Sequence, residues 1–452
     1  MKSLRRIFKS GVLIEAAMVA FLAFVLSFAG NALADQNILI YFDGHMHTTR
    51  SDGSGTVDDI KATAVARGLS AVIITDHCKS LTKAEWDSLV AETAAVSDGA
   101  FLALPGFEVT GSDGMFNRDH MLALGVSDPF VGDDAEELCP EEVWTSPENP
   151  YGTGPMYPEN LTKWVDYIHS KGGVAVYNHP SGMVRTEYGV NCMEVYNQSH
   201  VDDVAGYAKL MGYSDEDAWG FGITLNNLTI YGERDINMPV MFPGYEDPIP
   251  MRNALYMATY MFSGVGQWLG TPLVPDGSPA VPLNSWDQLL LAYVNGSIDT
   301  PIFGLANTDS HNTGDPDSKV GVVKNGVYLR ELSAAELYKA IKAGRSFATT
   351  GPSLAFDVNG ELMGDTAYIF DGCATINLSV NSENPAAILA KIDIIKNGQI
   401  WKTIAPMAPA YSATLSDGVT ENGYYRVEVT ALDLGAGGYS FAWSNPVFVA
   451  IP

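Results

Sequence analysis

The sequence predicts two structural parts, a parallel α/β barrel and then a small antiparallel β-sandwich. From residue 37 to about residue 345, short apolar runs alternate with segments of helical spacing, which is typical of a parallel α/β fold. After Gly351-Pro352 the helical period disappears, and strand-like runs are separated by turn residues. In addition, histidines and carboxylates directly follow several apolar runs, as expected at the carboxyl ends of barrel strands.

Seven apolar runs of the first part are expected to be buried strands. They cover residues 38–42, 71–74, 101–104, 121–124, 174–177, 193–196 and 302–305. The segments with helical spacing are 57–66, 83–95, 161–171 and 287–293. Residues 201–284 break this rhythm and are rich in Met, Tyr, Trp, Gly and Pro. We expect them to form an insertion at the barrel rim, either a lid or substrate pocket, or a structural cap or dimer surface.

The second part has the pattern of an all-β domain. Strands are expected at residues 355–358, 375–380, 391–396, 423–431 and 446–450. Asn397-Gly398 is a strong signal for a two-residue hairpin turn. This part contains no histidine and no cluster of potential ligands, so we expect it to be an accessory domain. The predicted domains are the barrel over residues 35–350 and the β-sandwich over residues 351–452.

Residues 1–34 have the features of a secretory signal peptide. A positively charged start is followed by an apolar stretch over residues 16–29 and by the small residues Ala32-Leu33-Ala34. Cleavage after Ala34 would give a periplasmic or secreted protein without a stable membrane span. A retained membrane anchor is the alternative, although Glu15 leaves the apolar stretch short for a full span.

The formal net charge of −27 bears on the partners of the protein. Binding to a phosphate backbone needs patches of Lys and Arg, and no basic run follows the N-terminus. We therefore expect a small-molecule substrate and no nucleic acid partner.

The four cysteines are Cys78, Cys139, Cys192 and Cys373, and none of them has the CxxC spacing of a zinc site. An oxidising compartment would permit a disulfide, and a Cys139–Cys192 bond is one possibility. We expect Cys78 to be a buried thiol at the end of a strand.

The strongest functional signal is a set of histidines and carboxylates at the ends of the predicted strands. Six of the eight histidines and three carboxylates form it, namely His45, His47, Asp52, His77, Glu108, His120, His179, Asp309 and His311. In a strand, side chains alternate with a period of two, so both imidazoles of a His-x-His pair lie on the same side. Satisfied surface histidines are the alternative for a lone pair of this kind. Nine nitrogen and oxygen donors at one rim instead predict a polynuclear metal site.

These residues resemble the PHP family, the polymerase and histidinol phosphatase superfamily of metal-dependent hydrolases. The resemblance runs from Asp43 to about His311, and all nine residues match ligand positions of the family in order. The stretch from Gly344 to Pro352 also resembles exported PHP proteins related to carbaryl hydrolase. The resemblance implies a distorted (β/α)7 TIM-like barrel with two or three divalent metal ions, which could be zinc, manganese or iron.

The resemblance also implies how the ligands are shared. One ion would be held by His45, His47, Glu108 and Asp309, a second by Glu108, His120 and His179, and a third by Asp52, His77 and His311. Glu108 would bridge two of the ions. A metal-bound hydroxide would then be the nucleophile of a hydrolysis reaction.

Residues around the ligands are candidates for supporting roles. We expect Arg185 to act with Asp309 and Glu108 in catalysis, since a phosphate substrate needs a cation beyond the metals, and Arg50 and Lys319 are weaker candidates. Three neighbours of ligands, Asp43, Asp76 and Asn178, could orient imidazoles or could cap turns. Glu194 ends a strand and could line the pocket. His169 and His200 are expected to lie outside the cluster.

Three functions remain open at this point. Most of the family resemblance predicts a phosphoesterase acting on a small phosphoester. The subgroup resemblance and the few basic residues near the motifs predict a hydrolase of carbamate, ester or amide bonds instead. The third is a non-catalytic, metal-containing binding protein.

Overall fold

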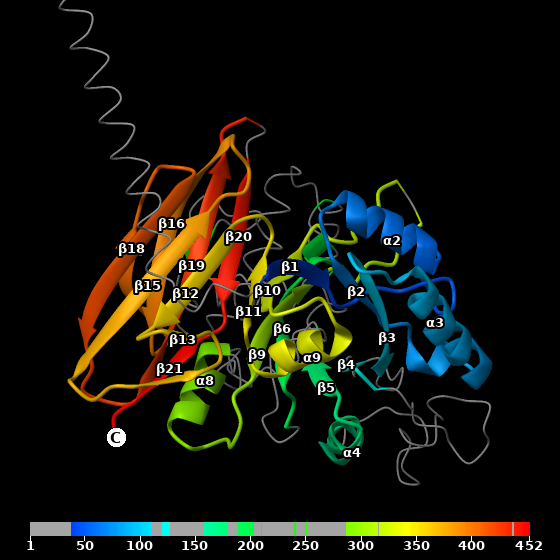
Figure 1. Ribbon diagram of the computed structural model, residues 1–452, viewed down its shortest axis with the longest axis horizontal. Helices are drawn as coiled ribbons and strands as arrows, with labels where there is room; N and C mark the ends of the chain where they lie inside the picture. The colour runs from blue at the N-terminus through cyan, green and yellow to red at the C-terminus, as the bar shows by residue number, and fades with distance from the viewer. Residues whose placement is uncertain are drawn as a thin grey trace, which may run out of the picture. The chain divides into compact units, whose positions relative to one another are not determined.

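The computed structural model describes residues 38–109, 120–126, 158–178, 189–199, 201–202, 209, 239–240, 249–250, 286–314, 316–435 and 438–452. Within these residues the fold is mixed α/β, with one large sheet, a second smaller sheet and a few helices (Figure 1). A short two-stranded sheet, β7 (Pro239–Val240) and β8 (Ile249–Pro250), stands apart from both.

The first part of the large sheet is built from the apolar runs that the sequence indicates. Its strands, in spatial order, are β1 (Ile38–Asp43), β2 (Ala71–Ile74), β3 (Leu102–Val109), β4 (Met121–Leu124), β5 (Val174–Tyr177), β6 (Cys192–Asn197) and β9 (Phe303–Asn307). The segments that follow β1 and β9 meet again, because the His47 amide donates to the Ser310 carbonyl at 3.0 Å and the Asp309 amide donates to the His45 carbonyl at 2.9 Å. The first and last of these strands are thereby joined beyond their carboxyl ends.

The direction of β4 differs from the prediction. We expected parallel strands throughout this part, but β4 is antiparallel to both β3 and β5. The chain between the end of β3 at Val109 and the start of β4 at Met121 is short. A parallel pair needs a crossover of about a dozen residues or more, usually with a helix, whereas an antiparallel return does not.

Helices flank these strands, and their starts follow from the sequence. The helices are α2 (Val57–Ala66), α3 (Lys83–Val96), α4 (Pro158–Ser170), α8 (Trp286–Val294) and α9 (Ala334–Lys342), with a 3-10 turn η1 (Cys78–Ser80). Capping boxes open α2, from Thr56 to Asp59, and α3, from Thr82 to Glu85. No helix within the described residues is both long and apolar enough to cross a membrane.

The C-terminal residues form two sheets that enclose a second core. One sheet has the order β13 (Glu361–Leu362), β12 (Ser353–Val358), β15 (Cys373–Asn381) and β18 (Ala410–Gly418). The strands of the other are β14 (Thr366–Tyr368), β16 (Ala387–Lys396), β17 (Gln399–Ile404), β19 (Gly423–Asp433), β20 (Tyr439–Ser444) and β21 (Val447–Ala450). Leu354, Phe356 and Ile376 from the first sheet share a buried cluster with Ile392 and Val427 from the second. Alternate residues of β12 and β15 face this core, as the period of two requires.

The hairpin predicted at Asn397-Gly398 is confirmed. Both residues have positive φ, 52° for Asn397 and 75° for Gly398, and Lys396 pairs with Gln399. The turn therefore joins β16 directly to β17.

The large sheet continues from the first part into the second through two strands that the sequence analysis did not identify. These are β10 (Lys324–Leu329), beside β1, and β11 (Ser346–Thr349), which pairs with β20. A buried ion network also joins the parts: the Arg426 guanidinium donates to the Asp287 carboxylate at 2.7 and 2.6 Å and to Glu428 at 2.5 Å. Within the C-terminal part and nearer the surface, the Lys396 ammonium donates to the Asp417 carboxylate at 2.6 Å.

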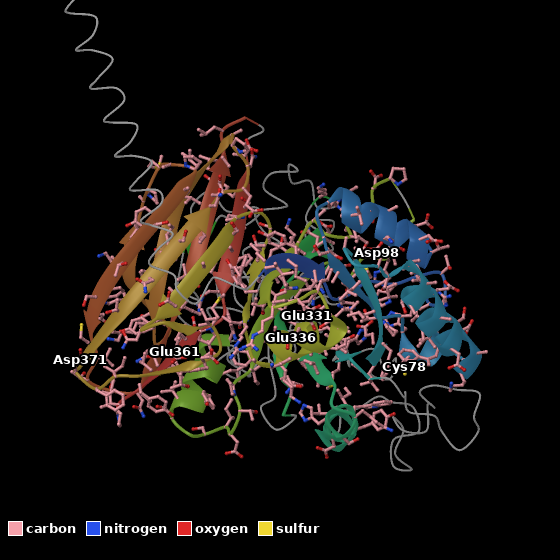
Figure 2. The ribbon with its side chains drawn as sticks, viewed as in Figure 1. Cys78, Asp98, Glu331, Glu336, Glu361 and Asp371 are labelled. Carbon is pink, nitrogen blue, oxygen red and sulfur yellow. The ribbon has the colours of Figure 1, made fainter. Side chains whose placement is uncertain are left out.

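Acidic side chains are spread over both parts of the described structure. Figure 2 labels Asp98 after α3, Glu331 and Glu336 around the start of α9, and Glu361 and Asp371 among the C-terminal strands. The negative charge of the chain is therefore not confined to one of the two parts.

The state of the cysteines differs from the prediction. Cys78, labelled in Figure 2, is buried and disulfide-bonded, whereas Cys192 has a free, buried thiol. The expectation of a buried thiol at Cys78 and the possible Cys139–Cys192 bond are therefore wrong; Cys139 itself lies outside the described residues. Cysteine pairing depends on which strands become neighbours, and the spacing of cysteines does not encode this.

Candidate metal centre

Potential ligands lie at one edge of the first part of the sheet, where strands end. Those that follow a strand are His45, His47, His77, Asp309 and His311. Parallel bridges connect Met46 with Ser310 and His77 with Glu108, so these segments lie side by side at that edge. Strand ends that are distant in the sequence, such as those near Met46 and Ser310, meet because the carboxyl ends of parallel strands lie at the same edge of a sheet.

His120 reaches this edge from the opposite end of a strand. It precedes β4, whose amino end lies beside the carboxyl ends of β3 and β5 because β4 is antiparallel to both. Glu108 pairs with Leu122, and the Asn178 amide donates to the His120 carbonyl at 3.1 Å. The reversed direction of β4 is therefore what brings His120 to the other ligands.

The first group of potential metal ligands is His45, His47 and Glu108, whose donor atoms lie within 4.8 Å of one another. Asp309 adjoins them, because its Oδ1 is 3.2 Å from Nε2 of both His45 and His47. Both imidazoles are fully buried. Their Nε2 atoms are 3.3 Å apart, so both rings present the same nitrogen to the same place.

Glu108 belongs to a second group as well. Nδ1 of His120 is 2.8 Å from its Oε1, and Nδ1 of His77 is 2.8 Å from its Oε2. Asn178 Nδ2 also donates to Oε1 at 2.5 Å. A carboxylate placed between two groups of donors can bridge two cations about 3.5–4 Å apart, the separation in two-metal hydrolases.

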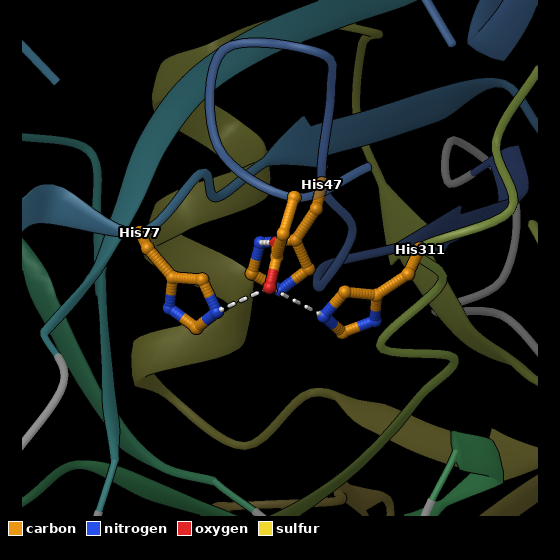
Figure 3. A group of neighbouring side chains, drawn as sticks. His47, His77 and His311 are labelled. Atoms are coloured by element: carbon orange, nitrogen blue, oxygen red, sulfur yellow. Dashed lines mark ion pairs between the residues drawn. The ribbon is translucent and has the colours of Figure 1, made fainter. Parts of the chain in front are cut away.

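A third group surrounds Asp52. His77 and His311 both point towards one carboxylate beside His47 (Figure 3), and the distances from Oδ2 of Asp52 to their Nε2 atoms are 3.2 and 3.4 Å. His47 Nδ1 is 3.5 Å from Oδ1 of the same carboxylate. His47 and His77 are thus shared between groups, which the family resemblance did not imply.

Close backbone packing holds Asp52 in this place. A Cβ on Gly53 would lie 2.1 Å from the His47 carbonyl oxygen, so glycine is required there. The Ser54 amide donates to the His311 carbonyl at 2.8 Å. The loop that carries Asp52 is therefore fixed against the loop that carries His311.

Two neighbouring carboxylates anchor loops rather than imidazoles. Asp76 accepts from the Thr48 amide at 2.6 Å, the Thr48 hydroxyl at 2.7 Å and the Ser51 hydroxyl at 2.6 Å. Asp43 accepts from the Thr308 hydroxyl at 2.5 Å, and burial raises the pKa of Asp43 to about 6. Of the two roles that the sequence left open for these neighbours, Asp43 and Asp76 take the one that fixes loops, and Asn178 donates its side-chain amide to Glu108.

The backbone at Asp309 is strained. Its φ is 51°, in the left-handed region that few residues other than glycine adopt. Strain of this kind is about 1–3 kcal/mol and persists where the surroundings impose it, commonly at functional sites. No sequence pattern predicts this conformation.

The charges of the groups reinforce one another. For Glu108, burial opposes ionisation, but His120, His45 and His77 lower its pKa well below the usual range. For His77, burial opposes the charged form, but Glu108 and Asp52 raise its pKa to about 10. The carboxylates are therefore ionised and attract positive charge to this edge.

The donor set fits divalent metal ions. Glu108 is 1% exposed, and a buried carboxylate needs a compensating cation or a protonated partner. When the imidazoles are neutral, as metal ligands must be, bound cations would balance the charges of Glu108, Asp309 and Asp52. Mixed imidazole and carboxylate donors without thiolates suit zinc, manganese or iron.

Some sequence-predicted residues lie outside the described part of the chain, and others are described but lie away from the site. His179, Arg185, His200 and most of residues 201–284 lie outside the described residues. Arg50 donates to Glu92 at 2.5 Å and to Ser88 at 3.2 Å, so it is engaged by α3. Lys319 lies 3.5 Å from Asp202. His169, as expected, is elsewhere, with its Nε2 2.9 Å from Asn191 Oδ1.

Glu194 is a buried carboxylate that contacts a potential ligand directly, whereas the sequence suggested only that it could line the pocket. Glu194, in β6, places Oε1 2.9 Å from His45 Nδ1, on the side of the ring away from Glu108. The sequence analysis placed Glu194 at the end of a strand, but in the structure it lies within β6 (Cys192–Asn197), three residues before the strand ends.

No protein-family model and no curated protein matches the chain. Solved structures do match. A two-domain protein from Bacteroides vulgatus that contains a predicted PHP-like metal-dependent phosphoesterase is 12% identical, with 88% of this chain and 92% of that chain covered and a TM-score of 0.35. The lesion-specific endonuclease Q of Pyrococcus furiosus is 14% identical, with 68% and 56% covered and a TM-score of 0.31.

A complex of endonuclease Q with a 27-mer duplex that has an abasic lesion at the active site also matches, at 12% identity, with 74% of this chain and 60% of that chain covered and a TM-score of 0.34. The Bacteroides vulgatus protein is described as PHP-like, and the PHP family is the one that the ligand residues of this chain resemble. The expectation of no nucleic acid partner is contradicted by these matches to nucleic-acid-cleaving proteins, and the net charge alone was too coarse a basis for it.

Proposed function

We propose that the protein is a metal-dependent hydrolase that cleaves a small phosphoester. One observation carries the proposal: the carboxylate of Glu108 contacts His120 through one oxygen and His77 through the other, at 2.8 Å each. Two groups of donors that share a buried carboxylate are what a two-metal hydrolase needs.

The three groups of donors assign each residue to one or two metal ions. His45, His47 and Asp309 with Glu108 would hold one ion, and His77 and His120 with Glu108 a second. Asp52 and His311, with His47 and His77, would hold a third, so the count is two or three. Bound ions would acidify water and stabilise negative charge on the attacked group. The chain itself contributes the fixed geometry, since the imidazoles are tied to buried carboxylates before a substrate arrives.

Phosphate binding in this proposal falls to Arg185, which lies outside the described residues. Among the described cations that the sequence suggested, Arg50 is engaged by Glu92 and Lys319 lies beside Asp202. This engagement favours a second candidate, hydrolysis of an uncharged carbamate, ester or amide bond. The same donors would serve either reaction, and the resemblance of the 344–352 segment to carbaryl hydrolase relatives agrees with the second.

The remaining features of the proposal concern architecture and location. We propose that residues 35–350 form a distorted (β/α)7 barrel, which agrees with the return of β9 to the end of β1, and that residues 351–452 form a β-sandwich. We also propose export, with cleavage after Ala34, because the first residues have the pattern of a signal peptide.

The test is hydrolysis by the protein from Asp35 onward of a chromogenic phosphodiester and, in parallel, an aryl carbamate. Each is measured after chelation and after adding back zinc or manganese, with metal content determined by mass spectrometry. Phosphodiester cleavage that chelation abolishes supports the first candidate, and carbamate cleavage alone supports the second. His77→Ala should lose activity, whereas His169→Ala, a histidine outside the site, should keep it. A protein that binds metal but cleaves neither compound would favour a binding protein.

A further inference from the structure

Glu194 belongs to a network of buried, hydrogen-bonded polar side chains and is the member that contacts His45. Its Oε1 lies 2.9 Å from His45 Nδ1 and accepts from Asn307 Nδ2 at 2.9 Å, and its Oε2 accepts from Asn197 Nδ2 at 2.7 Å. Asn307 is itself bonded to Asn325, whose Nδ2 donates to Asn307 Oδ1 at 3.1 Å. All of these side chains are buried.

Backbone groups that can only donate fix the direction of the hydrogen bonds made by Asn325 and Asn307. The Ala306 amide donates to Asn325 Oδ1 at 2.8 Å, so the amide nitrogen of Asn325 faces Asn307. The Gly44 amide donates to Asn307 Oδ1 at 3.0 Å, so the amide nitrogen of Asn307 faces Glu194. Neither side-chain amide can be reversed without placing two donors together.

These hydrogen bonds determine which nitrogen of His45 carries a proton. Each oxygen of Glu194 accepts from a side-chain amide, so the Oε1 that faces His45 acts as an acceptor and Nδ1 of His45 acts as the donor. His45 must then carry its proton on Nδ1. Nε2 lies on the other side of the ring, 3.2 Å from Asp309 and 3.6 Å from Glu108, and its lone pair is the one that a metal ion would take.

We propose that Glu194 is a positioning residue that fixes the Nδ1–H form and the ring orientation of His45, so that Nε2 is ready to bind a metal ion. The proposal rests on the proposed function only in that this edge of the sheet binds metal. It adds a residue that belongs to none of the three donor groups and assigns Asn307 and Asn325 as its support. A carboxylate behind a metal-binding imidazole orients the ring and makes it a better ligand.

The test measures zinc binding to chelator-stripped protein by competition with a chromogenic chelator, so it does not depend on knowing the substrate. Glu194→Gln keeps the size of the side chain and removes its charge, and it should weaken one bound ion by about 10–100-fold while leaving the others. Added to His45→Ala, the same change should have little further effect, because Glu194 acts through His45. Asn445→Ala is the matched control: it removes buried hydrogen bonds to Gly304 and Ser346 and should leave zinc affinity unchanged.

A second measurement detects the proton on Nδ1 of His45 directly. Nitrogen-15 spectra of histidine-labelled, zinc-loaded protein should show a protonated Nδ1 on His45, assigned with His45→Ala, and Glu194→Gln should shift or broaden that signal. If Glu194→Gln does not fold, Glu194→Asp keeps the charge but withdraws it from the imidazole and should weaken the same ion.

The outcomes separate the inference from the proposed function. Wild-type protein that binds zinc, with unchanged affinity in Glu194→Gln or with weakening that persists in the His45→Ala background, overturns the role of Glu194 and leaves the metal centre intact. Wild-type protein that binds no zinc overturns both. Zinc binding that follows the expected pattern, in a protein that cleaves neither test compound, supports the role of Glu194 and counts against the proposed reaction.

Discussion

Removing the carboxylate of Asp76 should release the loop that carries Asp52. Asp76 accepts three hydrogen bonds of 2.6–2.7 Å, from the amide and hydroxyl of Thr48 and the hydroxyl of Ser51. A hydrogen bond to a charged group contributes about 1.5–3 kcal/mol, but the three share one carboxylate and do not add fully. We therefore expect Asp76→Ala to lower the free energy of unfolding by about 3–5 kcal/mol, near the upper end for single substitutions.

Asp76→Asn should be milder. Its oxygen can still accept from the Thr48 amide and the Ser51 hydroxyl, which both bond to Oδ1, and the Thr48 hydroxyl can turn to accept from the new amide. We expect a loss of about 1–2 kcal/mol, mainly the difference between a charged and a neutral acceptor. Because Asp52 sits only one residue beyond Ser51, Asp76→Ala should also lose the ion of the Asp52 group, and Asp76→Asn should keep part of it.

The assay is urea unfolding followed by circular dichroism, with metal content measured on the same preparations. Asp59→Ala is the matched control, because Asp59 also accepts from an amide and a hydroxyl, those of Thr56, but at the exposed start of α2. That change should lower stability by about 1 kcal/mol and leave metal content unchanged. An Asp76→Ala protein within about 0.5 kcal/mol of wild type and with its full metal content would refute the reasoning.

Three further changes test other parts of the structure. Gly53→Ala would place a Cβ 2.1 Å from a backbone oxygen, so thermal unfolding should occur at lower temperature and one metal ion should be lost; unchanged melting would contradict the close packing. Arg426→Met leaves the buried Asp287 carboxylate without its cation and should cost about 3–5 kcal/mol in urea unfolding, whereas a change below 1 kcal/mol would argue against a buried network. Burial opposes ionisation of Asp417, but the Lys396 ammonium lowers the pKa of this carboxyl below its unfolded value. The ionised carboxylate therefore stabilises the fold at pH values above its unfolded pKa. This stabilisation disappears as the pH falls through the folded pKa. Asp417→Asn should therefore be less stable than wild type near pH 7 and should lose less stability on acidification; parallel pH profiles would contradict this.

Local patterns in the sequence were enough to predict many elements. Residues 57–66 and 71–74 form the helix and strand that their spacing indicates, and Asn397-Gly398 forms its hairpin. These are short-range effects: a capping box or a two-residue turn is complete within a few residues. Helix α9 also has a local signal, because the Ser333 side chain accepts from the Glu336 amide at the start of the helix.

The sequence by itself indicated most of the residues that gather at one edge, because polar residues that follow apolar runs lie at strand ends; His120 instead precedes its strand, and His179 lies outside the described residues. Only the tertiary structure decided how they meet. The direction of β4, which brings His120 to the site, depends on a chain return that hydrophobic spacing does not encode. The contact of Glu194 with His45 spans 149 residues, and that of Asp43 with Thr308 spans 265. Distances of that kind, like the strained backbone of Asp309, are set by the packing of whole strands against one another, and a pattern of neighbouring residues contains no information about them.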